Sequence, residues 1–263
     1  MTNETPSGMI DSLAGTDSGP SPAEIAFARA YLAPGEMDPA LWAQAFDPEL
    51  TAARLTAETE RRARDWPRIG QYRDANAALT SPPRAIFMGD SITEAWVIGD
   101  PEIFSDGVIG RGISGQTSPQ HLLRFMPDVI NLKPRCVHIL SGVNDIAGNT
   151  GPSTPDDYKN NILAMLTLAE AHNIRVILAS LLPAAMFLHA PGVDPRPRIS
   201  ELNVWLQKTA NARGHIHADY HSVLDAGDGS MRAELTRDGL HPTQAGYLTM
   251  RPVTLAALNA AAG

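Results

Sequence analysis

Four polar clusters in the sequence together hold the groups that acyl transfer requires. They supply a serine hydroxyl, a glycine whose backbone a ligand can approach, a carboxamide, and a carboxylate close to an imidazole. A serine hydroxyl is a weak nucleophile until a base such as an imidazole takes its proton. In chain order the clusters are Gly89-Asp90-Ser91, Ile113-Ser114-Gly115-Gln116-Thr117, Gly142-Val143-Asn144-Asp145 and Asp238-Gly239-Leu240-His241-Pro242.

The residue types and their spacing predict a role for each group. Ser91 is the expected nucleophile and His241 its base, and Asp238 is expected to orient the imidazole and stabilise its positive charge. A spacing of three residues puts Asp238 and His241 on one side of a turn, so their side chains can meet. The backbone N–H groups of Ser91 and Gly115 and the side chain of Asn144 are the expected donors to a tetrahedral oxyanion.

Alternating strand and helix patterns from residue 84 onward explain where these clusters stand. Such alternation predicts a parallel sheet covered by helices on both faces. Functional sites in such sheets form at the carboxyl ends of the strands, which is where the first three clusters fall. Strands are predicted at 85–88, 107–109, 136–140, 174–181 and 216–219, and helices at 118–130, 155–172, 200–213 and 243–260.

The four clusters, in this order, resemble the four sequence blocks of the SGNH hydrolases, also called GDSL esterases and lipases. The resemblance covers residues 84–250, and four ordered blocks are far more specific than any one of them. It implies a three-layer α/β/α fold of flavodoxin-like type with a mostly parallel five-stranded sheet. It also implies the roles given above for the serine, glycine, asparagine and histidine, with Asp238 completing the triad. Ile92 replaces the leucine of the family name, a volume-conserving exchange.

The resemblance and the residues together predict a serine esterase. We expect it to hydrolyse carboxylic esters, favouring short-chain acyl or acetyl esters, through an acyl-enzyme and with neither a metal nor an organic cofactor. An acyltransferase or a thioesterase on the same fold is one alternative, because only the acyl acceptor differs. A catalytically silent carbohydrate- or lipid-binding module is a second alternative, against which an intact triad counts.

The substrate-binding residues are the least defined part of the prediction. Residues 182–199 form a Pro-rich connection, and a loop of this length in a compact domain is often functional. Its apolar residues Met186, Phe187 and Leu188, with Asp90 beside the serine, are the candidate substrate contacts. The alternative is a surface excursion that packs its own small apolar cluster.

Two other motifs point to different chemistry. Gly110, Gly112 and Gly115 match a dinucleotide-binding fingerprint, but Arg135 occupies the region where that motif needs an acid, so a tight turn is the better interpretation. A second motif is a set of three histidines and one aspartate at alternate positions along and beside the strand predicted at 216–219. These side chains could bind a metal, or they could simply reach solvent where the strand leaves the sheet. The set comprises His215, His217, Asp219 and His221.

Composition restricts the class of partner. The chain of 263 residues has a net charge of −8, which argues against nucleic acid or an anionic membrane as the main partner. Apolar residues make up 43% of it, enough for a sizeable core. Cys136 is the one cysteine, which excludes an internal disulfide and a multi-cysteine metal site. No apolar run approaches the ~20 residues of a membrane helix. A small-molecule ester is the expected partner, and the oligomeric state is not predicted.

The chain divides into three expected segments. Residues 1–20 are rich in Ser, Gly, Thr and Pro and are expected to be a flexible tail. Residues 21–80 are expected to form helices that pack on the main domain, and residues 81–263 form the SGNH hydrolase domain. Helix starts are predicted at Ser21-Pro22, Asp38-Pro39 and Asp47-Pro48. The apolar positions expected to pack are Phe27, Leu32, Leu41, Trp42, Phe46 and Leu55.

The start of the chain leaves its location open. The sequence Met1-Thr2-Asn3-Glu4 has no basic n-region and no apolar h-region follows it. We expect a cytoplasmic protein if Met1 is the natural start, and a periplasmic or secreted one if a signal peptide was removed.

Overall fold

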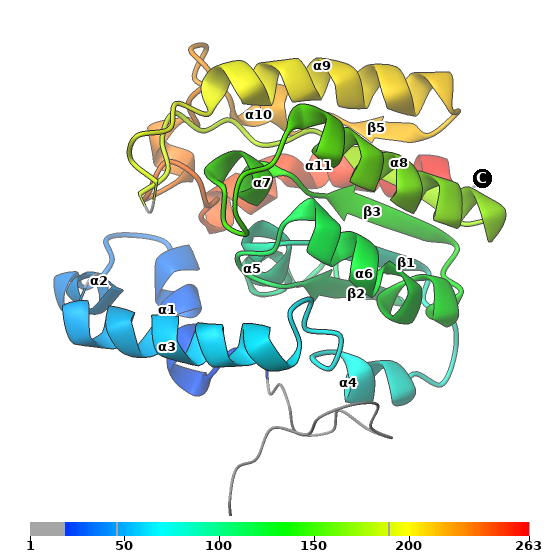
Figure 1. Ribbon diagram of the computed structural model, residues 1–263. Helices are drawn as coiled ribbons and strands as arrows, with labels where there is room; N and C mark the ends of the chain where they lie inside the picture. The colour runs from blue at the N-terminus through cyan, green and yellow to red at the C-terminus, as the bar shows by residue number, and fades with distance from the viewer. Residues whose placement is uncertain (1–18, 46, 189, 263) are drawn as a thin grey trace, which may run out of the picture.

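A computed structural model describes residues 19–45, 47–188 and 190–262. Within these residues, five strands form one sheet in the order β2-β1-β3-β4-β5, and every neighbouring pair is parallel (Figure 1). This is the flavodoxin-like order, which confirms the predicted fold. The strands are β1 (Ala85–Gly89), β2 (Val108–Gly112), β3 (Cys136–Leu140), β4 (Arg175–Ala179) and β5 (Ile216–Ala218).

The central strands are buried on both faces, which is why they read as continuous apolar runs rather than as alternating patterns. Every residue of β1 and of β3 is buried. Phe87 of β1 stacks on His138 of β3 with ring centroids 4.3 Å apart, and Trp96 packs edge-on against both rings. The core is therefore centred on the strands whose carboxyl ends carry two of the four polar clusters.

Helices cover both faces of the sheet (Figure 1). On one face α5 (Ser91–Gly99) packs on β1 and β2, and α11 (Gln244–Ala262) packs on β4 and β5. On the other face α6 (Ser118–Asp128) lies against α8 (Pro155–Ala171), and α9 (Arg196–Ala212) covers β4 and β5. Two further short helices, α7 (Val143–Ala147) and α10 (His221–Leu224), follow β3 and β5.

Most helix boundaries follow local sequence signals, but the predicted start of one helix is wrong. Thr154 and Asp157 form a capping box at the start of α8, as the Thr-Pro-acid pattern predicts. Gly214, predicted to end the helix before β5, has a φ of +71°. However, α9 begins at Arg196 rather than at residue 200, so the predicted connection 182–199 ends earlier, at residue 195. Proline is tolerated in the first turn of a helix, which is why this Pro-rich stretch belongs partly to the helix.

Two glycines allow α5 to approach the sheet closely. A Cβ on Gly112 of β2 would stand 2.2 Å from the backbone nitrogen of Glu94 and 2.7 Å from the backbone oxygen of Asp90. A Cβ on Gly89 of β1 would stand 2.9 Å from the Cβ of Thr93 in α5. Because neither glycine carries a Cβ, the first turn of α5, with Ser91, lies directly on the ends of β1 and β2.

The N-terminal segment forms the three helices that its Pro and cap residues predict, and a fourth, short helix that has neither signal. They are α1 (Pro22–Leu32), α2 (Pro39–Ala45), α3 (Pro48–Arg64) and α4 (Arg73–Ala77). Ser21 caps α1 in a capping box, and α1 lies against α5. Trp42 is only partly buried, and Leu55 is largely exposed. Phe46 and residues 1–18 of the expected tail lie outside the described residues.

No helix in the described parts of the chain has the length and apolar character to cross a membrane.

Candidate active site

The fold gathers the four predicted clusters at one edge of the sheet. Ser91 begins α5 directly after β1, Gly115 follows β2, and Asn144 lies in the first turn of α7 after β3. Asp238 and His241 lie in the turn just before α11. The carboxyl ends of parallel strands share one edge, so these residues meet although they span 150 positions between Ser91 and His241.

Ser91, His241 and Asp238 form a continuous hydrogen-bonded chain. Ser91 Oγ lies 2.9 Å from His241 Nε2, and His241 Nδ1 lies 2.7 Å from Asp238 Oδ2. Asp90, not Ser91, is the N-cap of α5, since its Oδ1 accepts from the N–H of Ile92. The serine hydroxyl is therefore not needed as the cap of α5, and it faces the imidazole.

Asp238 and His241 stabilise each other's charged forms. Burial alone would raise the pKa of Asp238, yet its hydrogen bond and attraction to His241 hold that pKa well below its ordinary value. Burial would likewise lower the pKa of His241, but the hydrogen bond and charge of Asp238, with a smaller contribution from Asp90, raise it above 6.5. An ionised Asp238 would thus stabilise a protonated His241 imidazole.

Three hydrogen-bond donors lie near the serine. Within the described residues, neither the N–H of Ser91 nor that of Gly115 donates to another group, and Gly115 adopts a φ of +77°. The side-chain nitrogen of Asn144 donates to the carbonyl of Gln116 at 2.9 Å and approaches Asp90 Oδ2 at 3.4 Å. Two backbone N–H groups and one carboxamide are therefore the candidate donors to a developing oxyanion.

Asn149 is a site residue that sequence reasoning missed. Its side-chain nitrogen donates to Asn144 Oδ1 at 2.8 Å and to the carbonyl of Gly115 at 3.3 Å. The first bond fixes which way the Asn144 amide points, because its oxygen faces Asn149 and its nitrogen faces Asp90 and the carbonyl of Gln116. Only its distance of five positions from Asn144 could have indicated it, and that spacing alone carries no specific signal.

Asp90 lies beneath the site and is almost fully buried, at 1% exposure. Burial is the main reason that its pKa is raised, to about 7, and the neighbouring Asp145 adds to the shift. The carboxyl of Asp90 therefore takes up a proton near neutral pH. Its carboxylate contacts the Asn144 amide and the backbone of α5, so its charge can act on Asn144 and on the first turn of α5.

The three apolar residues of the predicted substrate loop differ in burial. Phe187 is fully buried in the core, whereas Met186 and Leu188 are each 46% exposed. The aromatic ring therefore holds the loop on the domain, whereas Met186 and Leu188 are exposed apolar side chains of the loop.

The two rival motifs have structural explanations. A Cβ on Gly110 would stand 2.5 Å from a methyl of Val97, so this glycine, like Gly112, allows α5 to pack on the sheet. His215 pairs with Glu170 at 2.9 Å, and Asp219 bonds Ser222. Across the described ranges, no three His, Cys, Asp or Glu side chains converge in a way that could hold a metal.

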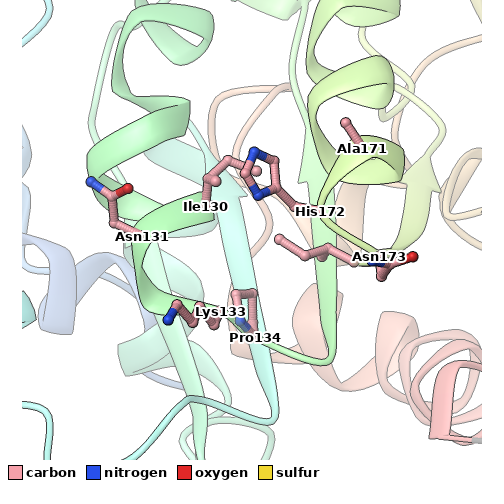
Figure 2. Close-up of a pocket in the computed structure, with 8 residues that line it drawn as sticks. Ile130, Asn131, Lys133, Pro134, Ala171, His172 and Asn173 are labelled. Atoms are coloured by element: carbon pink, nitrogen blue, oxygen red, sulfur yellow. The ribbon is translucent and has the colours of Figure 1, made fainter.

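A surface depression of about 690 Å³ is lined by Lys133, Pro134 and His172, among others (Figure 2). Pro134 and Ile174, which line it, precede β3 and β4, so it lies at the amino ends of these strands. None of the predicted site residues lines it, and its lining includes one fixed positive charge, that of Lys133.

Comparison with known proteins agrees with the geometry. A protein from Bacteroides fragilis described as an acylhydrolase is 42% identical, and its crystal structure covers 74% of this chain and 98% of its own with a TM-score of 0.72. A GDSL-like lipase from Bacteroides thetaiotaomicron is 40% identical, covering 75% of this chain and 100% of its own, also with a TM-score of 0.72.

A curated relative matches a shorter stretch. The uncharacterized lipoprotein YqeF of Bacillus subtilis is 30% identical over 79 residues, which is 29% of this chain and 32% of that protein. The chain thus matches about a third of the length of this relative.

A family model covers the region that holds the four clusters. The model of the GDSL-like Lipase/Acylhydrolase family matches residues 87–248, a stretch that runs from β1 into α11 and contains all four clusters. The predicted resemblance is therefore confirmed, and the chain belongs to the GDSL-like lipase/acylhydrolase family of ester hydrolases.

Proposed function

We propose that this ester hydrolase acts through Ser91, His241 and Asp238, and that short-chain acyl or acetyl esters are its substrates. The observation that carries the proposal is the unbroken chain from Ser91 Oγ to His241 to Asp238, with separations of 2.9 Å and 2.7 Å. Both separations are ordinary hydrogen-bond lengths, so a proton can pass from the hydroxyl to the imidazole without rearrangement.

Acylation follows from this geometry. Ser91 Oγ attacks the carbonyl carbon of the ester and gives its proton to His241 Nε2, while the carbonyl π electrons move to the oxygen. The N–H groups of Ser91 and Gly115 and the amide of Asn144 stabilise that oxyanion. The intermediate then re-forms its carbonyl, the carbon–oxygen bond to the alcohol breaks, and His241 protonates the departing alkoxide.

Deacylation reverses the roles with water as the acceptor. His241 takes a proton from a water molecule, whose oxygen attacks the acyl carbon. Collapse of the second tetrahedral intermediate breaks the bond to Ser91 Oγ, which recovers its proton from the imidazolium. The products are the carboxylic acid and the free enzyme, and Asp238 remains ionised throughout.

The preference for small acyl groups rests on the surroundings of the serine. Asp90, Asn144 and the carbonyl of Gln116 are polar groups in hydrogen-bond contact with one another beside it. Phe187, the largest apolar residue of the expected substrate loop, is buried in the core and unavailable to a long acyl chain. Met186 and Leu188 are proposed to contact the rest of the substrate.

A panel of aryl esters from acetate to decanoate, together with acetylated saccharides, tests this proposal. We expect the highest kcat/KM with the shortest acyl groups, and a loss on the order of 10⁴-fold or more in Ser91→Ala. Ser105→Ala is the matched control, because the hydroxyl of this serine donates to the carbonyl of Glu102 on an exposed turn. Turnover that persists in Ser91→Ala would refute serine catalysis, and a preference for decanoate would refute the proposed substrate class.

A further inference from the structure

We propose that Tyr31, from the N-terminal helix α1, is a positioning residue of the active site that holds the Asp238–His241 turn in its working geometry. The inference rests on the proposed function, because it assumes that Asp238 orients His241. Tyr31 lies more than 200 positions away from this turn in the sequence and outside the residues that the family model matches.

The Tyr31 hydroxyl contacts the turn at three points. It lies 3.0 Å from Asp238 Oδ1 and 2.8 Å from the carbonyl oxygen of His241, and it accepts a hydrogen bond from the N–H of Arg237 at 3.1 Å. A phenol has a single proton, so the first two contacts share it in a three-centre hydrogen bond. One hydroxyl therefore ties together the carboxylate and the backbone at both ends of the turn.

The contact reaches the carboxylate oxygen that does not touch the imidazole. Asp238 Oδ2 accepts from His241 Nδ1, while Oδ1 accepts from the backbone N–H groups of Leu240 and His241 and from Thr236 Oγ1. All of these donors belong to residues 236–241. Among the described residues, Tyr31 provides the one donor to Asp238 that comes from another element, so it fixes the turn relative to the rest of the molecule.

The phenol is held where it can perform this role. Its residue is 7% exposed, and its ring meets the His241 ring edge-on with centroids 6.4 Å apart. Burial, followed by the negative charge of Asp238, raises the pKa of Tyr31 well above its ordinary value. The hydroxyl therefore stays protonated at neutral pH, and it remains a donor to the ionised carboxylate.

A clamp from Arg237 keeps the end of α1 in place. Its Nε donates to the carbonyl of Tyr31 at 2.8 Å, and its Nη2 donates to the carbonyls of Ala33 and Gly35 at 2.8 Å and 2.6 Å. These carbonyls belong to the C-terminal end of α1 and the residues after it, where helix carbonyls lack partners within the helix. Arg237, the residue next to Asp238, thus holds the end of α1 against the turn. The Tyr31 hydroxyl adds a second attachment, from α1 to the turn.

A double-mutant cycle with Asp238 tests this inference. In the full chain, Tyr31→Phe keeps the ring and removes only the hydroxyl, and we expect kcat to fall ~10-fold or more with KM changed less than about twofold. If the hydroxyl acts through the carboxylate, the same substitution in an Asp238→Ala background should change kcat by less than about twofold. A purely structural role would lower activity equally in both backgrounds.

Tyr220→Phe is the matched control for the loss of a buried phenol hydroxyl. The Tyr220 hydroxyl bonds His138 Nε2 and Thr254 Oγ1 in the core, so its removal should lower the melting temperature and leave kcat unchanged. A Tyr31→Phe protein with the kcat of the parent, or with equal losses in the two backgrounds, would overturn the proposal. Lack of Ser91-dependent turnover in the parent would instead overturn the proposed function itself, and it is measured before any Tyr31 variant.

Discussion

The Asn144 carboxamide is engaged from both sides. Asn149 donates to its oxygen, and its nitrogen donates to the carbonyl of Gln116 at 2.9 Å. The second hydrogen of that nitrogen is held only weakly, 3.4 Å being a long contact to Asp90 Oδ2. An oxyanion beside Ser91 would offer this hydrogen a stronger acceptor, so the interaction would form mainly in the transition state.

Asn144→Ala should therefore lower kcat on the order of 10²–10³-fold while KM changes little. Asn144→Asp should be at least as damaging, because a carboxylate would repel the oxyanion. Asn131→Ala, an exposed substitution at the opposite end of the sheet, serves as the control and should keep full activity. Steady-state kinetics on folded variants decides the matter, since a near-normal kcat in Asn144→Ala would remove this residue from the oxyanion hole.

Asp90 makes a separate prediction about pH. Ionised Asp90 helps to raise the pKa of His241, so Asp90→Asn should lower that pKa and move the acid limb of the kcat/KM profile to lower pH. Asparagine keeps the cap of α5, so the helix should persist. An unmoved acid limb, or one that moves to higher pH, would show that the charge of Asp90 does not reach the imidazole.

The same substitution should change how stability depends on pH. Because burial raises the pKa of Asp90 to about 7, the folded protein binds a proton that the unfolded chain releases near pH 4. The parent therefore loses the stability linked to this group as pH rises from about 4 through 7. Urea unfolding of Asp90→Asn should lack that part of the loss, and identical pH dependence in the two proteins would contradict the buried, proton-binding state.

At the level of elements, the close approach of α5 to the sheet gives the site its rigidity. Gly112→Ala would place a Cβ 2.2 Å from the backbone nitrogen of Glu94, and no flexible side chain can move aside. We expect a loss of unfolding free energy on the order of 1–3 kcal/mol and lower activity, as Ser91 moves with the helix. Gly192→Ala, which has open space around the new Cβ, is the control. Equal urea midpoints for the two variants would contradict this account.

The sequence predicted the elements best where a local signal was strong. The buried runs of β1 and β3 and the Thr154 cap of α8 lie within a residue of their predicted places, because burial and capping are encoded in neighbouring residues. The start of α9 at Arg196 was missed, because Pro-rich sequence suits both loops and first helical turns. The short helix α7 carries no apolar period long enough to predict.

In the candidate site too, residues in local motifs could be predicted and residues outside them could not. Ser91, Asn144, Asp238 and His241 could be proposed from sequence because each stands in a short motif at a strand or helix boundary. Asn149 and Tyr31 stand in no motif, and they reach the site through tertiary contacts alone. Tyr31 contacts a residue 207 positions away, a separation at which a single sequence holds no pairing information.

At the level of the whole molecule, the N-terminal helices and the segment after them contact the hydrolase fold at several points. The carbonyls of Trp66 and Pro67 accept from the side chains of Gln120 and Gln116, and the Tyr72 hydroxyl donates to the carbonyl of Gly112 at 2.5 Å. These contacts lie along β2 and α6, while Tyr31 reaches the turn before α11. We therefore expect residues 21–80 to stabilise the hydrolase domain rather than to fold apart from it.

Two truncations test that expectation. Removing residues 1–75 should lower the melting temperature, increase binding of a hydrophobic dye and reduce esterase activity, because apolar residues under α1 become exposed and the Tyr31 contact is lost. Removing residues 1–18, a stretch with little to bury, should leave all three unchanged. A melting temperature unaffected by the longer truncation would show that the segment is only a linker.

The central claim, that Ser91 is the nucleophile activated by His241, is tested most directly by covalent labelling. A fluorophosphonate reacts with an activated serine and loses fluoride, and intact-mass analysis with peptide mapping locates the adduct. We predict one adduct per chain on Ser91, a labelling rate that falls on the order of 10³-fold or more in His241→Ala, and no adduct in Ser91→Ala. An adduct on another serine, or labelling that is as fast without His241, would contradict the account.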